Sequence, residues 1–143
     1  MLNASRFILP IILLALTSIA EASDANMLIG KWAGPCNMAN SASSEFTSTL
    51  SEFKSDGTAE IGNLVYGDSQ CAGPVIRTEQ KDVVSYSATD TTIQIDGNVS
   101  GRMIFKLTAE YLIQGEEMTL YNAKSTIAGE TTDIPSTILK RVR

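Results

Sequence analysis

One stretch decides the fold: residues 28–36 read Leu28-Ile29-Gly30-Lys31-Trp32-Ala33-Gly34-Pro35-Cys36. It contains the only tryptophan of the chain and the first of its two cysteines. Because side chains alternate along a strand, Leu28, Gly30 and Trp32 fall on one face. Gly34-Pro35 then ends the strand, since proline cannot donate a hydrogen bond to a ladder. We expect this stretch to be the first strand of a closed or nearly closed antiparallel sheet.

The rest of the chain alternates between extended runs and turn signals. Runs rich in Thr, Val, Ile and aromatic residues favour strands, and Asp-Gly or Gly-rich tetrapeptides between them favour turns. The strands that this pattern predicts are 45–53, 58–66, 75–87 (one bent strand or two short ones), 91–95, 101–108, 111–113, 117–121 and 136–142. Turns are expected at 54–57, 67–70, 96–98 and 114–116, loops at 37–44 and 124–135, the second with room for one short strand, and a frayed lead-in at 23–27. Short strands at this spacing predict an all-β domain, either a barrel or a sandwich.

The N-terminal segment has the pattern of a signal peptide. Arg6 precedes the short apolar run 7–16, and Ala20 and Ala22 place small residues where a signal peptidase cleaves. Cleavage after Ala22 would leave one domain at 23–143, and cleavage after Ala20 is the alternative. A buried first helix is disfavoured because the run has no polar face. We therefore predict an exported protein, periplasmic or extracellular, with no transmembrane segment in the mature chain.

The two cysteines, Cys36 and Cys71, suggest a disulfide, because oxidising compartments favour the bond. By the chain-entropy argument, a disulfide that closes a loop of this length would stabilise the fold by roughly 4 kcal/mol. Two free buried thiols are the alternative.

Charge and composition narrow the possible partners and chemistry. The net charge is −5, an unfavourable sign for binding nucleic-acid phosphates but suitable for a basic protein partner. The chain has no histidine, so neither a Ser-His-Asp nor a Cys-His arrangement can form. Glu116 and Glu117 are adjacent and would point to opposite faces of a strand. We predict no catalytic residue, no metal site and no cofactor, and therefore not an enzyme.

Gly30-Lys31-Trp32 resembles the Gly-x-Trp signature of the lipocalins and the wider calycin group. Arg141 stands where that family places an arginine that packs on the tryptophan and closes the barrel. Small bacterial exported lipocalin-like domains look similar through most of residues 28–142. The chain lacks the Thr-Asp-Tyr loop motif and is shorter than many lipocalins, so the resemblance implies a smaller antiparallel up-and-down barrel of about eight strands. A core position in some other sandwich is the alternative role for Trp32.

Two functional hypotheses follow. In the first, the barrel binds a small apolar or amphipathic ligand, because few bulky aromatic residues are available to fill its interior. The residues expected to line this site, or else to form a dry core, are Trp32, Phe46, Leu50, Ile61, Tyr86, Ile93, Phe105 and Leu120. In the second, the barrel is a scaffold for protein recognition, such as an inhibitor or an envelope-assembly accessory protein, and uses the loops at 37–44 and 124–135.

Overall fold

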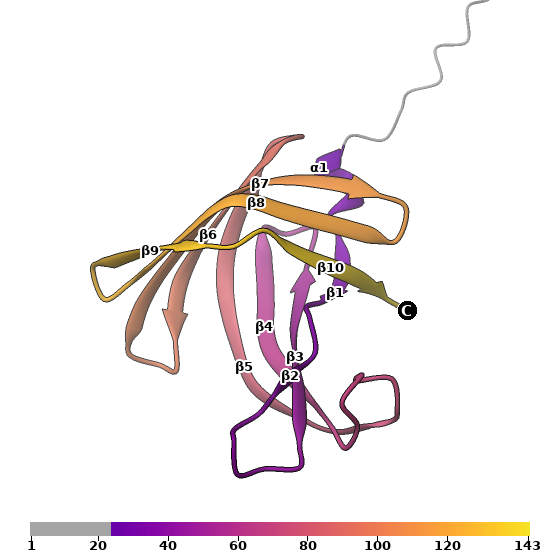
Figure 1. The fold of residues 1–143 in the computed structure, drawn as a ribbon. Helices are drawn as coiled ribbons and strands as arrows, with labels where there is room; N and C mark the ends of the chain where they lie inside the picture. Colours follow the sequence, from indigo (N-terminus) through magenta and orange to yellow (C-terminus); the bar gives the residue numbers. More distant parts are fainter. Residues whose placement is uncertain (1–23) are drawn as a thin grey trace, which may run out of the picture.

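A computed structural model describes residues 24–143 as an all-β structure with one short helix (Figure 1). The predicted signal peptide, residues 1–22, lies outside the described residues. No helix within 24–143 has the length and apolar character needed to cross a membrane. The elements in chain order are α1 (Asp24–Met27), β1 (Gly30–Ala33), β2 (Asn37–Met38), β3 (Phe46–Phe53), β4 (Thr58–Tyr66), β5 (Val75–Ala88), β6 (Thr92–Val99), β7 (Met103–Gln114), β8 (Glu117–Ile127), β9 (Glu130–Ile134) and β10 (Thr137–Val142).

The sheet closes on itself as an antiparallel barrel. Its ring runs β1, β10, β8, β7, β6, β5, β4 and β3, and β3 pairs with β1 to complete it. From β3 to β8 each strand is the neighbour of the next in sequence, which is the up-and-down arrangement. β2 pairs with β3 and β9 with β8, both outside the ring. The predicted barrel of about eight strands is therefore confirmed, and the sandwich alternative is excluded.

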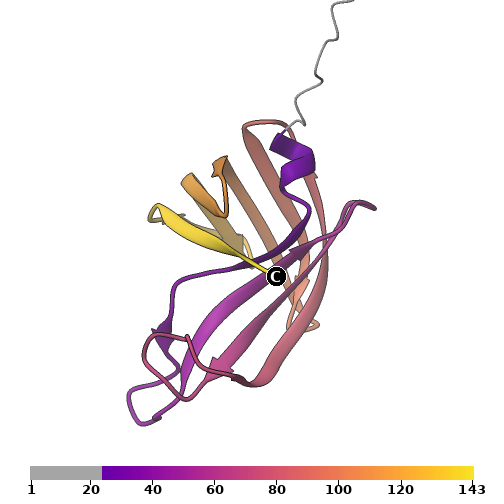
Figure 2. The ribbon, with the colours of Figure 1, turned by 90° about the vertical axis from the view of Figure 1, so that its right-hand side faces the viewer.

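The barrel closes through β1, which has only four residues and pairs with β10 on one side and β3 on the other (Figure 2). Trp32 lies opposite Arg141 in this register and is fully buried. The Arg141 guanidinium lies 4.2 Å from the centre of the indole ring. It also donates to the carbonyl oxygens of Ile29 (3.1 Å) and Met27 (2.5 Å). One side chain thus joins the last strand to the segment that leads into the first.

Gly30 makes room for this contact. Its φ of +126° is a conformation that side-chain-bearing residues rarely adopt. A Cβ at this position would also lie 2.9 Å from Nη1 of Arg141. Two physical requirements therefore favour glycine at position 30: the positive φ of the backbone, and the space that the Arg141 guanidinium occupies.

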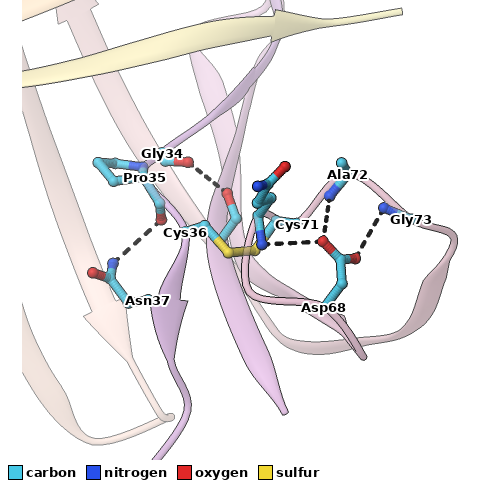
Figure 3. Close-up of a disulfide and its surroundings, with 10 residues drawn as sticks. Gly34, Pro35, Cys36, Asn37, Asp68, Cys71, Ala72 and Gly73 are labelled. Carbon is cyan, nitrogen blue, oxygen red and sulfur yellow. Dashed lines mark hydrogen bonds between the residues drawn. A yellow bond between two sulfur atoms is a disulfide. The ribbon is translucent and has the colours of Figure 1, made fainter. Parts of the chain in front are cut away.

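A disulfide joins Cys36, just after β1, to Cys71 in the β4–β5 loop (Figure 3). The two residues are 35 apart in sequence, and both cysteines of the chain are used. Asp68 organises the loop, because its carboxylate accepts hydrogen bonds from the backbone N–H groups of Gln70, Ala72 and Gly73. These bonds lower the pKa of Asp68 below its usual value. The predicted disulfide is confirmed, and the alternative of two free thiols is excluded.

Some predicted boundaries are wrong for identifiable reasons. The lead-in at 24–27 is a helical turn, and residues 37–38 form a short strand within the predicted loop. The turn expected at 96–98 is absent: β6 continues to Val99. A Cβ on Gly97 would lie 2.6 Å from Cγ1 of Val84, so this glycine marks close packing inside the barrel.

The predicted loop at 124–135 is instead a β-hairpin. β8 continues to Ile127, turns at Ala128-Gly129 and returns as β9. Both turn residues have positive φ, +50° and +87°, as a tight two-residue hairpin turn requires. The Ala-Gly sequence is a weak signal for such a turn, since Asn or Asp usually takes the first position.

β7 also differs from the prediction. It is one long strand with a bulge between Thr108 and Glu110, where the sequence suggested two strands.

Substituting Arg141 by alanine should destabilise the barrel by about 2 kcal/mol, because the variant loses the cation–π contact and two charge-assisted hydrogen bonds. Lysine should restore only part of this loss, since it cannot span the indole and both carbonyls. The measurement is the free energy of unfolding in urea. Lys140→Ala is the matched control, because Lys140 is exposed one residue earlier in β10. Equal stability of the two alanine variants would contradict this account of closure.

Candidate interior site

The barrel encloses a cavity of about 230 Å³. Its wall consists of residues from β3, β4, β6, β7, β8, β9 and β10 together with the segment that follows β1. The residues that line it are Gly34, Pro35, Thr49, Ser51, Phe53, Ile61, Ile93, Ile95, Phe105, Leu107, Met118, Leu120, Ile134, Thr137 and Leu139. Most of these side chains are apolar, as expected of a site for an apolar ligand.

The cavity has a buried end and an open end. Phe53, Ile93 and Met118 form the buried end, with at most 4% of each residue exposed. Pro35 and Thr49 are exposed and lie where β1 has ended. The cavity therefore opens at the rim formed by the Gly34-Pro35 segment and β3, on the side of the disulfide, and it narrows toward the packed interior.

Four of the eight residues predicted to line the cavity do so: Ile61, Ile93, Phe105 and Leu120. They come from four different strands, β4, β6, β7 and β8.

The other four predicted residues lie elsewhere. Trp32 is fully buried under Arg141, and its Nε1 donates to the Leu28 carbonyl (2.8 Å). Tyr86 packs edge-on against Phe53 and donates its hydroxyl to the Lys54 carbonyl. Phe46 and Leu50 are on the opposite face of β3 from the cavity-lining residues. Leu50 borders a small surface recess with charged neighbours, and Phe46 lies opposite Tyr66 near the disulfide.

The residues that sequence reasoning missed on β3 are Thr49, Ser51 and Phe53. Leu50, the apolar residue between Thr49 and Ser51, lies on the other face of β3, so the predicted inward face of this strand is one residue out of step. Counting back from Phe53 in steps of two would have found Ser51 and Thr49. In this barrel, small polar side chains at inward positions of β3 therefore indicate where the cavity lies.

Two larger hollows lie at the surface. A groove of about 460 Å³ runs over β5, β6, β7 and β8, and most of its lining side chains are polar. A cleft of about 750 Å³ lies beside the disulfide, between β10 and the β4–β5 loop. No cluster of three or more Cys, Asp or Glu side chains within residues 24–143 could hold a metal ion.

The charged groups with perturbed pKa values are outside the cavity. Arg77 binds Glu45 and Glu79, and the hydrogen bond from Arg77 lowers the pKa of Glu45. Lys54 binds Glu60 at 2.7 Å, which raises the pKa of Lys54 and lowers that of Glu60. These pairs lie on the exterior and stabilise the surface of the sheet only weakly.

Comparison of the chain with models of protein families, with curated proteins and with solved structures found no match.

Tyr111 should make the fold sensitive to alkaline pH. Burial, followed by the nearby charges of Asp24 and Asp90, raises its pKa to about 12, and its hydroxyl donates to the Thr89 carbonyl. An unfolded tyrosine titrates near pH ~10. The contribution of Tyr111 to the free energy of unfolding is therefore complete below pH ~10. It is lost as the pH rises toward about 12, because the tyrosine of the unfolded chain releases its proton first.

The measurement is the melting temperature between pH 9 and pH 12. Tyr111→Phe should be less stable at neutral pH, since it lacks the hydrogen bond, but should lose less stability across this alkaline range. Tyr121→Phe, in the neighbouring strand, is the control. An unchanged alkaline slope in Tyr111→Phe would contradict the assignment.

Proposed function

We propose that this protein is an exported barrel that binds a small apolar or amphipathic ligand in its interior. The observation that carries the proposal is the cavity of about 230 Å³ with its largely apolar wall. An eight-stranded barrel has an interior just wide enough for side chains to fill or to hold one small ligand. Here Gly34, Ser51 and Thr49 occupy inward or rim positions where larger side chains would have filled the space.

The size of the cavity limits the ligand. An apolar cavity of about 150 Å³ binds benzene, whereas pockets for drug-sized molecules start at about 300 Å³. A volume of about 230 Å³ lies between these values. The proposal is therefore for a ligand larger than benzene and smaller than a typical drug, with its affinity derived mainly from the apolar surface that it buries.

Two further observations support export and a lipocalin-like relationship. The Cys36–Cys71 disulfide is of the kind that persists in oxidising compartments, which supports the periplasm or the extracellular space. The contact of Arg141 with Trp32 at the junction of the first and last strands is the arrangement that the Gly-x-Trp resemblance implies. Both are compatible with a calycin-like carrier of small molecules.

Filling the cavity should abolish binding. Leu120→Phe adds bulk at a half-buried wall position, whereas Leu112→Phe adds the same group at a position that is 45% exposed on the outer face of β7. We expect a neutral fluorescent probe such as N-phenyl-1-naphthylamine, or 1-octanol measured calorimetrically, to bind the unmodified protein and Leu112→Phe. Affinity should fall at least tenfold in Leu120→Phe. Equal binding by both variants would place the ligand outside the cavity.

A second candidate function is recognition of a protein partner at the cleft beside the disulfide. Lys140 and Arg143 line this cleft together with Ile138, which is 51% exposed. Glu117 is the one acidic residue among the described residues of the cleft. In a chain of net charge −5, this local excess of cations around an apolar residue favours an acidic, extended protein segment as the partner.

Reversing the charge at the cleft tests this second candidate. The doubly substituted variant Lys140→Glu/Arg143→Glu should lose the partner that the unmodified protein retains from a periplasmic or culture extract at low salt. A control variant, Lys106→Glu/Lys124→Glu, carries the same charge change on the outer faces of β7 and β8. Retention of the same proteins by both variants would exclude the cleft as the binding surface.

A further inference from the structure

The cavity wall contains no charged side chain among the residues described. Alternation along the strands explains this separation: Glu52 lies between Ser51 and Phe53 in β3 but points to the other face. In β7, Lys106 likewise lies between Phe105 and Leu107 and points to the other face. The charges that these strands carry are therefore on the exterior, where they are solvated.

Arg141 is the cation that comes nearest to being an exception, because it shares the inward face of β10 with Leu139. Its guanidinium is already engaged, however, with the indole of Trp32 and with two backbone carbonyls. It is also absent from the residues that line the cavity. An anionic ligand in the cavity would thus have no counter-ion.

The polar side chains of the cavity wall are three hydroxyls, those of Thr49, Ser51 and Thr137. Thr137 donates its hydroxyl proton to the carbonyl of Pro135 (2.9 Å), which lies two residues before it, so the hydroxyl oxygen remains as an acceptor. The Gly34 N–H is used by the Thr49 carbonyl (2.8 Å), and Pro35 has no N–H. Only the hydroxyls of Thr49 and Ser51 add groups that can either donate or accept.

A carboxylate bears acceptors alone, and moving it from water to such a site is strongly unfavourable without a cation or several donors. A ligand with a neutral O–H or N–H end can donate to the Thr137 oxygen and leave its apolar part against Ile93 and Met118. Resting on the ligand-binding function proposed above, we propose that the cavity selects neutral ligands with a hydrogen-bond donor at one end and rejects carboxylates of the same chain length.

The test compares 1-octanol, octane and octanoate by calorimetry or by displacement of N-phenyl-1-naphthylamine. At pH 7.5 octanol should bind at least tenfold more tightly than octanoate. Lowering the pH to 4.5 protonates a large part of the octanoate, so its apparent affinity should rise at least tenfold while that of octanol stays the same. Octanoate binding as tightly as octanol at pH 7.5 would overturn the selectivity and leave the ligand-binding function in place.

A substitution separates the rim hydroxyl from the apolar wall. Thr137→Val keeps the shape of the side chain and should lower octanol affinity about fivefold to tenfold, the value of one hydrogen bond, with octane affinity unchanged. Thr119→Val is the matched control, because Thr119 lies opposite Ile138 on the outer face. Equal loss of octanol and octane would overturn the role of Thr137. If none of the three compounds binds the unmodified protein, the proposed function itself fails.

Discussion

The contact between Arg141 and Trp32 is the constraint on which the rest of the barrel depends. β1 offers only four residues to pair with β10 and β3, a short seam for closing a sheet. The guanidinium adds a contact with the indole and two hydrogen bonds to the carbonyls of Met27 and Ile29, which precede β1. Since Met27 and Ile29 are 114 and 112 residues from Arg141, these bonds join the two ends of the described chain directly. Gly30 is required at the same place because any side chain there would displace the guanidinium.

Closure at this seam determines which side chains face inward, and therefore the cavity. Once Trp32 is opposite Ser51 in the β1–β3 register, the inward positions of β3 are Thr49, Ser51 and Phe53. Two of these three are small and polar, so β3 contributes less volume to the interior than its alternate face would have done. The interior void is thus a consequence of the pairing register, and it forms next to the rim where β1 ends.

Much of the fold could be predicted from sequence because its signals are local. The Asp56-Gly57 turn, the bounds of β4 and the pairing of Cys36 with Cys71 follow from turn chemistry, alternation and an even cysteine count. The errors arise where tertiary packing reverses a local signal. Gly97 suggested a turn but instead lies against Val84, and Ala128-Gly129 makes a tight turn without the usual Asn or Asp. The two predicted wall residues of β3, Phe46 and Leu50, lie on its other face for a related reason: apolar character was taken as the sign of the interior, whereas the inward face of this strand is partly polar.

The two ends of the barrel differ in how their polar groups are hydrogen-bonded. The groups at the packed end stabilise the fold, whereas those at the rim remain available to a ligand. At the packed end, the indole N–H of Trp32 and the hydroxyl of Tyr111 each have a backbone carbonyl partner, so they hold the structure and are not available to a ligand. At the rim, the disulfide immediately follows Gly34-Pro35 and ties that segment to the β4–β5 loop. The covalent bond therefore limits the movement of the cavity entrance, while the hydroxyl oxygens of the rim stay accessible. A rigid entrance lowers the ordering cost of binding, so a cavity of modest volume can retain a small ligand with few polar contacts.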